Sequence, residues 1–218
     1  RVFYFTTCGW MMWNWLASGL LLKSTIYLYD GSPFHPNAEV LWNFVDSEKI
    51  NFMGVSAKYI DALSKENINL IGKYKLKNLE TIGSTGSPLI HESFDYIYTN
   101  VKKDVSVASL SGGTDIVGCF IGGNPLSVVR RGEIQGPILG MDVHVYDDNA
   151  NSLKNEKGEL VCIKSFPSMP LFFWNDNNNE KYHDAYFNKY ENVWCHGDYI
   201  LKTENDGFII FGRSDATL

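Results

Sequence analysis

The chain has 218 residues, a length that allows one large domain or two small ones. Hydrophobic residues make up 44% of the chain and charged residues 20%, so we expect a sizeable core and exclude the disordered class. The formal net charge of −6 argues against a nucleic-acid partner. The longest apolar run, residues 10–22, is interrupted by Asn14 and is shorter than the ~20 residues that a membrane-spanning helix needs, so no membrane segment is expected.

The first half of the sequence alternates between strand and helix patterns. We predict strands at residues 2–7, 25–29, 50–55, 79–83 and 104–110, and helices at residues 11–22, 37–47, 57–63 and 90–100. This alternation implies parallel strands joined by helices that cover the sheet.

The second half is richer in turns from about Asn124 onwards. We predict short strands at residues 143–146, 158–163, 192–200 and 207–212, with the Asn-rich segment 175–180 as a surface loop without a site. The predicted fold class is therefore α/β. A parallel sheet layered with helices (1–125) is followed by a smaller, mostly antiparallel, barrel-like β unit (126–218).

The four cysteines, Cys8, Cys119, Cys162 and Cys195, lie far apart, and no CxxC spacing occurs. This distribution favours free thiols over a disulfide framework or a zinc site. We therefore expect a reducing, cytoplasmic location.

Three loops follow predicted parallel strands and contain glycine or polar residues. They are TTCGWMMW (residues 6–13), TIGSTGSPL (81–89) and LSGGTDIV (110–117). Ligands of such sheets bind at the carboxyl ends of the strands, so the three loops would meet in one crevice if their strands are neighbours.

Each Gly-rich loop has a chemical and a purely structural interpretation. The backbone N–H groups of GSTGSP could hold an anion or the edge of a planar ring, but Ser87 and Pro88 also suit an ordinary helix start. In SGGTD, Thr114 could donate to a phosphate oxygen and Asp115 could hold Mg²⁺, or Asp115 could cap the next segment.

Two polar motifs close the chain. In HGD, Asp198 could accept from two vicinal ribose hydroxyls or could be a turn residue, and His196 is expected to be a packed strand histidine. In GRSD, Arg213 could reach sugar hydroxyls or phosphate, or form a local ion pair with Asp215.

The order of these segments is more specific than any one of them. The series GW, GSTGSP, GGTD, GEL, HGD and GRSD resembles the central part of the acyl-adenylate-forming enzymes. Within that superfamily, the strings CGWMMWNWL, LYDGSPFHP, SAKYID, FPSMP, FWND and GRSDATL are similar to the acetoacetyl-CoA synthetase family. The resemblance covers essentially the whole chain.

The resemblance implies a ligase of fatty acid and lipid metabolism whose substrates are ATP, acetoacetate and coenzyme A. The carboxylate attacks the α-phosphorus of ATP to give acetoacetyl-AMP, and the thiol of coenzyme A then displaces AMP. Mg²⁺ is implied because both the carboxylate and the triphosphate are negatively charged.

Residue roles follow from the same resemblance. The nucleotide-binding positions are Gly86, Ser87, Pro88, Gly113, Thr114, Asp198 and Arg213. The walls of the acyl pocket are Trp10, Met11, Met12, Thr85 and Gly112. The catalytic positions are Thr114, which touches the α-phosphate, and Asp115, which replaces the usual Glu that helps to hold Mg²⁺. Because Asp is one methylene shorter, a water could fill the gap.

Two further expectations concern specificity and completeness. Gly112 stands where acetyl-specific relatives carry Trp, so its small size would lengthen the pocket. Asp215 matches the hinge to a C-terminal domain. The triphosphate loop and the catalytic lysine are expected in missing N-terminal and C-terminal parts, so this piece alone is expected to be inactive.

Two other functions stay open. One is an adenylate-forming ligase for another short acid. The other is a nucleotide-binding homologue without turnover, which the replacement of Glu by Asp115 favours.

Overall fold

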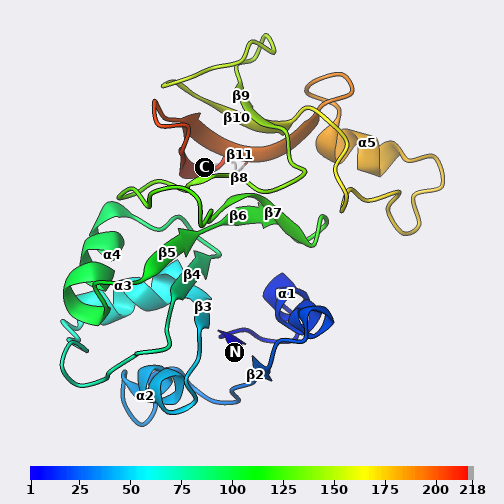
Figure 1. Ribbon diagram of the computed structural model, residues 1–218. Coiled ribbons are helices and arrows are strands. Elements are labelled where there is room, and N and C mark those ends of the chain that lie inside the picture. Colours follow the sequence, from blue (N-terminus) through cyan, green and yellow to red (C-terminus); the bar gives the residue numbers. More distant parts are fainter. Residues whose placement is uncertain (216–218) are drawn as a thin grey trace. The chain divides into compact units, whose positions relative to one another are not determined.

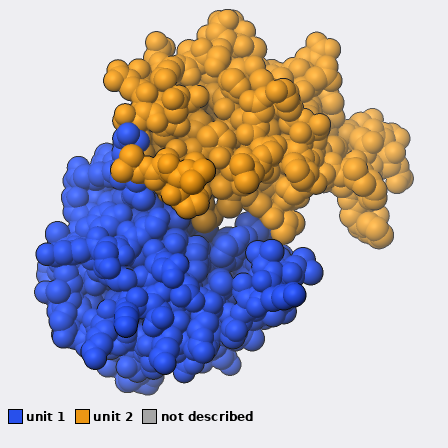
Figure 2. All heavy atoms as spheres, in the orientation of Figure 1, with its two compact units in different colours: residues 1–109, 129–132 blue, residues 110–128, 133–218 orange. Residues whose placement is uncertain are grey.

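The computed structural model describes residues 1–215, and these form two compact units (Figure 2). Unit 1 comprises residues 1–109 and 129–132, and unit 2 comprises residues 110–128 and the chain from 133 onwards. The chain thus enters unit 2 at Leu110, whereas the change of sequence pattern had placed this boundary near Asn124. No helix in the described part of the chain is long and apolar enough to cross a membrane.

Unit 1 contains a five-stranded sheet in the order β2-β1-β3-β4-β5, in which each neighbouring pair is parallel. The strands are β1 (Val2–Tyr4), β2 (Ile26–Tyr27), β3 (Phe52–Ser56), β4 (Thr81–Thr85) and β5 (Ser106–Ser109). This confirms the predicted parallel sheet.

Helices join these strands (Figure 1). They are α1 (Met11–Ser18) with the 3₁₀ turn η1 (Gly19–Leu22), α2 (Val40–Ser47), α3 (Ala57–Lys65), and α4 (His91–Tyr96) with the π-helical turn η2 (Ile97–Val101). α3 begins directly after β3 because Ser56 caps it, its hydroxyl accepting from the backbone N–H of Tyr59 at 3.3 Å.

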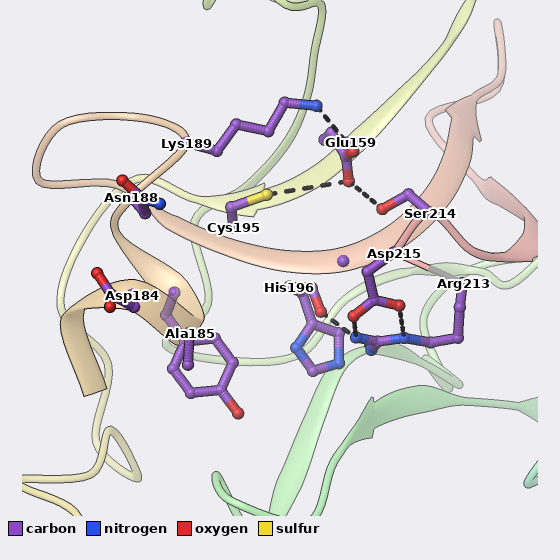
Figure 3. A pocket seen from close by; sticks show the side chains of 12 residues that line it. Glu159, Asp184, Ala185, Asn188, Lys189, Cys195, His196, Arg213, Ser214 and Asp215 are labelled. Carbon is purple, nitrogen blue, oxygen red and sulfur yellow. Dashed lines mark hydrogen bonds and ion pairs between the residues drawn. The ribbon is translucent and has the colours of Figure 1, made fainter. Parts of the chain in front are cut away.

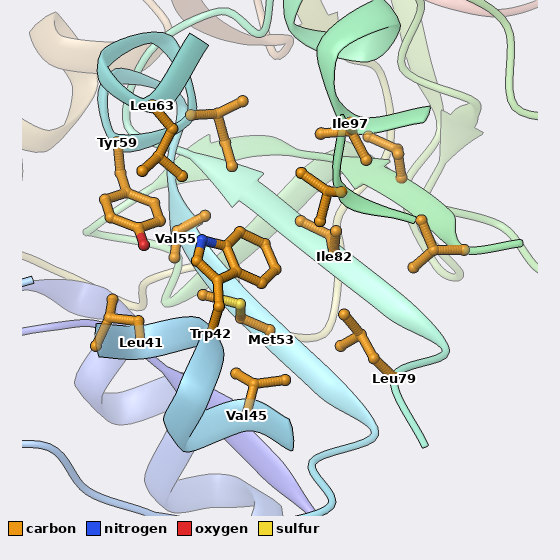
Figure 4. Close-up of a cluster of buried hydrophobic side chains, with 14 of the residues drawn as sticks. Leu41, Trp42, Val45, Met53, Val55, Tyr59, Leu63, Leu79, Ile82 and Ile97 are labelled. Atoms are coloured by element: carbon orange, nitrogen blue, oxygen red, sulfur yellow. The ribbon is translucent and has the colours of Figure 1, made fainter. Parts of the chain in front are cut away.

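The two faces of the sheet bury different clusters, as the period-2 alternation of a strand requires. Phe3 and Met53 pack in the large cluster that includes residues of α2, α3 and α4 (Figure 4). Tyr4 points to the opposite face and packs with Met12 and Leu16 of α1.

Aromatic rings lie over glycines on the α1 face. Tyr4 is paired with Gly54, and a Cβ added at Gly54 would overlap the Tyr4 ring. One strand further along, a Cβ at Gly83 would lie 2.5 Å from Cζ of Phe52. The glycines therefore make room for the rings of the neighbouring strands.

Unit 2 is built on antiparallel sheets of order β12-β11-β10-β9 and β6-β7-β8. The strands are β6 (Ser111–Gly113), β7 (Gly118–Gly122), β8 (Gly136–Pro137), β9 (Val143–Tyr146), β10 (Lys157–Cys162), β11 (Trp194–Lys202) and β12 (Phe208–Arg213). Strands β9 to β12 confirm the predicted antiparallel half.

The sequence interpretation missed the β6–β7 hairpin and helix α5 (Glu180–Tyr186). α5 starts within the Asn-rich segment that was expected to be only a loop. The carboxylate of Asp176 accepts from the backbone N–H groups of Lys181 at 3.2 Å and Tyr182 at 2.9 Å, which satisfies the open end of the helix.

Candidate functional site

Asp198 and Arg213 lie opposite each other on the antiparallel strands β11 and β12. Nη1 of Arg213 is 3.5 Å from Oδ1 of Asp198 and donates to the carbonyl oxygen of His196 at 3.0 Å. Asp198 is buried, while the side chain of Arg213 is 49% exposed. The structure therefore brings together two of the residues that the motifs singled out.

The carboxylate of Asp198 is also held by the SGGTD segment. Its Oδ2 accepts from Oγ of Ser111, the first residue of β6, at 3.2 Å. Burial raises the pKa of Asp198 above its ordinary value, although Arg213 and the hydrogen bond from Ser111 act in the opposite direction. Sequence reasoning missed Ser111 as a partner of the HGD motif.

SGGTD forms the first strand and the start of the turn of the β6–β7 hairpin. Thr114 and Asp115 are exposed in the turn, which the backbone N–H of Val117 closes by donating to the carbonyl of Thr114 at 3.1 Å. Oδ2 of Asp115 accepts from the phenol O–H of Tyr186 at 2.5 Å. A side chain from α5 thus fixes the position of this carboxylate.

Tyr186 is in turn fixed by an aromatic stack. Its ring lies parallel to that of Trp194, with 3.6 Å between centroids and 14° between planes. Burial and the hydrogen bond to Asp115 raise the pKa of the phenol, so it carries its proton at neutral pH. Tyr182 and Tyr186 are four residues apart, a helical spacing that was the available sequence signal for this element.

The described residues offer one carboxylate to a cation at the turn. They contain no cluster of three or more His, Cys, Asp or Glu side chains that could form a complete metal site. Mg²⁺ bound together with phosphate commonly takes only one or two carboxylates and several waters. Asp115 fits that role through Oδ1, because Tyr186 already occupies Oδ2.

A cavity of about 350 Å³ lies next to Arg213 in unit 2 (Figure 3). Its lining includes Glu159, a buried residue whose carboxylate accepts from Nζ of Lys189 at 2.9 Å and from Oγ of Ser214 at 2.6 Å. Asp215 also lines it and is paired with Arg213. His196 and Gly197 of the HGD motif line this cavity, whereas Thr114, Asp115 and Asp198 do not, so the cavity borders the contact between Asp198 and the SGGTD segment.

The thiol in this cavity is not a nucleophile at neutral pH. Burial and the nearby charge of Glu159 raise the pKa of Cys195 to about 11. The thiolate form that a nucleophile requires is therefore disfavoured at Cys195.

The GSTGSP segment belongs to unit 1. Gly86 has a φ of +89°, and a Cβ there would lie 3.3 Å from Cζ2 of Trp10. The alternative interpretation of Ser87 and Pro88 as an ordinary helix start is wrong, because α4 starts at His91 with Ile90 at its N-cap and without a side-chain cap. A helix start therefore does not explain these residues.

The other pocket candidates of unit 1 differ in exposure. Met12 is 1% exposed and packs in the core with Tyr4 and Leu16, so it is a core residue rather than a surface wall. Trp10 and Met11 are only partly buried. Thr85 ends strand β4, directly before Gly86.

The structure corrects the reason given for Gly112. A Cβ there would overlap the carbonyl oxygen of Gly118 and lie 2.5 Å from Cα of Cys119, both in β7. The backbone has no positive φ at Gly112. The glycine is thus required by close strand pairing, and a side chain at this position would meet β7 before it could fill a pocket.

The comparison with known proteins gives one consistent result. Over all 218 residues the chain is 55% identical to the acetoacetyl-coenzyme A synthetase of Rhizobium meliloti (strain 1021) and 45% identical to the acetoacetyl-CoA synthetase of Gallus gallus. The whole chain is homologous to acetoacetyl-CoA synthetases. It spans 34% and 33% of the length of these two synthetases. No protein-family model matches the chain.

A solved acetoacetyl-CoA synthetase shares the fold. The enzyme from Streptomyces lividans matches with a TM-score of 0.93 and 42% sequence identity, over 100% of this chain and 34% of that one. The parallel sheet with helices and the antiparallel sheets are therefore the architecture of this part of a synthetase.

Proposed function

We propose that the chain is part of an acetoacetate–CoA ligase that works through an acetoacetyl-AMP intermediate. The observation that carries the proposal is the similarity to acetoacetyl-CoA synthetases over every residue of the chain. The contacts of Asp198 with Arg213 and Ser111 support the proposal, because they bring the SGGTD, HGD and GRSD motifs together within unit 2.

In this proposal the nucleotide is bound by polar groups of known geometry. The carboxylate of Asp198 accepts from the ribose hydroxyls, and the guanidinium of Arg213 donates to the same region. Gly86, Ser87 and Pro88 contact the adenine, and Gly113 lets the α-phosphate approach the backbone. Because the carboxylate of Asp198 is buried, ligand hydroxyls that donate to it would replace the hydrogen bonds it has lost to water.

The chemistry is two displacements. The acetoacetate carboxylate attacks the α-phosphorus and pyrophosphate leaves; the thiolate of coenzyme A then attacks the acyl carbon and AMP leaves. The hydroxyl of Thr114 donates a hydrogen bond to an α-phosphate oxygen as charge develops there. Mg²⁺, when bound, neutralises phosphate charge, and Asp115 held by Tyr186 is the residue that would hold it.

The remaining catalytic groups are proposed to lie in other parts of a longer protein. These groups are the loop that grips the β- and γ-phosphates and the lysine that promotes adenylation. Asp215 is proposed as the hinge residue between half-reactions. We also propose a cytoplasmic location, which the four free cysteines support.

A ligase for another short acid is the second candidate. Strand pairing with β7 accounts for Gly112, so the size of residue 112 no longer favours acetoacetate over other short acids. The identity of the acid then rests on the similarity to named synthetases.

An ATP–pyrophosphate exchange assay on the full-length protein tests these functions. We expect exchange with acetoacetate that exceeds exchange with acetate, butyrate or 3-hydroxybutyrate. Asp198→Asn should raise the KM for ATP by about tenfold to a hundredfold, the cost of weakening a buried, charged hydrogen-bond acceptor. The control is Asp206→Asn, because Asp206 is an exposed turn residue bound to Lys154 and Lys202.

Each outcome selects one function. Preference for a different acid would replace acetoacetate but keep the adenylation. ATP binding without exchange for any acid would select the homologue that lacks turnover.

A further inference from the structure

His196 is a buried titratable residue that the proposed function does not use. It is 6% exposed, and its Nε2 is 3.1 Å from the carbonyl oxygen of Gly112 in β6. A carbonyl oxygen only accepts, so Nε2 must carry the proton in this contact. The other nitrogen, Nδ1, lies 3.5 Å from Nε1 of Trp194, which only donates. Both neighbours therefore select the same neutral tautomer.

The imidazole is also pressed against the next residue of the hairpin. A Cβ added at Gly113 would lie 2.7 Å from Cε1 of His196. On its other side the ring meets Phe120 of β7, with 4.8 Å between centroids. The two adjacent glycines of SGGTD are thus required for different reasons. The missing side chain at Gly112 lets β7 pair closely with β6, and the missing side chain at Gly113 leaves space for the ring of His196.

Burial, rather than the charges around the ring, favours the neutral imidazole. Burial lowers the pKa of His196, and Arg213 acts in the same direction, while Asp198 and Asp215 act against it. Oδ2 of Asp198 is 3.9 Å from Nε2, and Arg213 donates to the backbone carbonyl of His196. A neutral ring with its proton on Nε2 agrees with the contacts to Trp194 and to the carbonyl of Gly112.

We propose that His196 is a positioning residue that fixes the SGGTD hairpin relative to Asp198. Its Nε2–H holds the carbonyl of Gly112, two residues before Thr114, and it stands two residues before Asp198 on β11. It would set the distance between the phosphate-binding turn and the ribose-binding carboxylate without touching the nucleotide. The effect on nucleotide binding rests on the proposed function, whereas the positioning of the hairpin by the hydrogen bond to Gly112 does not.

Two amide variants of the full-length protein separate the hydrogen bond from simple packing. In His196→Gln the amide nitrogen can reach the place of Nε2 and still donate to Gly112. In His196→Asn the amide ends near the place of Nδ1 and cannot. The control is His144→Asn, because His144 lies partly exposed on β9 with Asp142 and Ser152 as its partners.

Hydrogen exchange gives a readout that needs no nucleotide. We expect the amides of the β6–β7 hairpin to exchange about tenfold faster in His196→Asn, because the partly buried carbonyl of Gly112 loses its donor, and to stay within about twofold of wild type in His196→Gln. The KM for ATP should follow the same order, with about a tenfold rise in His196→Asn. A merely destabilised protein would lose active molecules without a change in KM.

Hydrogen exchange and the KM for ATP test different parts of the proposal. Equal hairpin exchange in the Gln and Asn variants would overturn the positioning role. If exchange distinguishes them as expected but the wild type does not bind ATP, the positioning role stands and the proposed function falls.

Discussion

At the scale of single residues, the contact between Tyr186 and Asp115 leads to a direct test. Tyr186→Phe removes the phenol O–H that holds Oδ2 of Asp115, yet keeps the ring that stacks on Trp194. We expect the KM for ATP to rise about threefold to tenfold, because the exposed carboxylate loses its fixed orientation, with Tm almost unchanged.

A matched phenol lies on the same helix. Tyr182→Phe removes an O–H that donates to the carbonyl of Pro170 at 2.7 Å, away from Asp115. It should leave the KM for ATP unchanged. Equal KM values for the two Phe variants would show that Tyr186 does not orient Asp115.

The buried His196 predicts a pH dependence of stability. Its folded-state pKa is lowered, mainly by burial, so below about pH 6.5 the unfolded chain binds a proton that the folded chain does not. The free energy of unfolding should therefore fall as the pH drops from about 6.5, by at most ~1.4 kcal/mol per pH unit. Asp198, whose pKa is raised by burial, gives a trend of opposite sign, because there the folded chain binds a proton that the unfolded chain does not.

The measurement is the difference between wild type and His196→Gln in urea titrations from pH 7 to pH 5. The variant cannot titrate at residue 196, so its curve should be flatter over this range. Parallel curves would mean that the pKa of His196 is the same in the folded and unfolded chains.

Some of the candidate site could be predicted at this scale and some could not. HGD lies within a hydrophobic strand pattern and GRSD ends one, and these polar motifs were enough to single out Asp198 and Arg213. Ser111 and Tyr186 were missed because their roles depend on partners 87 and 71 residues away, and a single sequence carries no sign of such pairing.

At the scale of secondary structure, the ring-over-glycine packing of the sheet can be tested at Gly54. In Gly54→Ala the new methyl group overlaps the ring of Tyr4, which α1 holds in place. We expect a loss of about 1–3 kcal/mol in the free energy of unfolding, the usual cost of overpacking a core.

The matched control is Gly9→Ala. Gly9 has no atom within 4 Å of an added Cβ and no positive φ. Its change in stability should stay within about 0.5 kcal/mol. Equal Tm values for the two variants would show that Tyr4 moves aside without cost.

The strands and helices that could be predicted from the sequence are those with a clear pattern of apolar residues. The strands of unit 1 are short apolar runs between turn signals, and their linking helices carry an apolar face. The β6–β7 hairpin has three glycines in the segment SGGTDIVG, so strand propensity is weak there and pairing decides its structure. α5 was hidden because an Asn-rich stretch leads directly into it and provides its N-cap, Asn179.

At the scale of the whole molecule, we expect the 218-residue chain by itself to show no acetoacetate-dependent pyrophosphate exchange. Positioned binding groups accelerate a reaction only if the charge of the transition state is also stabilised. The chain spans about a third of the length of the synthetases that it matches. Exchange by this chain, at a rate that Asp198→Asn lowers, would contradict this prediction.

The path of the chain between the units also bears on how the molecule could be divided. Residues 129–132 return to unit 1 between two stretches of unit 2. There Val129 packs against the large cluster, and Arg131 forms a two-pronged ion pair with Asp95, with contacts of 2.6–3.0 Å. A cut after Ser109 would therefore leave four residues of unit 1 on the other piece. A gene divided at that point would yield an N-terminal product that lacks part of its own core, so the two units are not independent modules that recombination could exchange by one crossover.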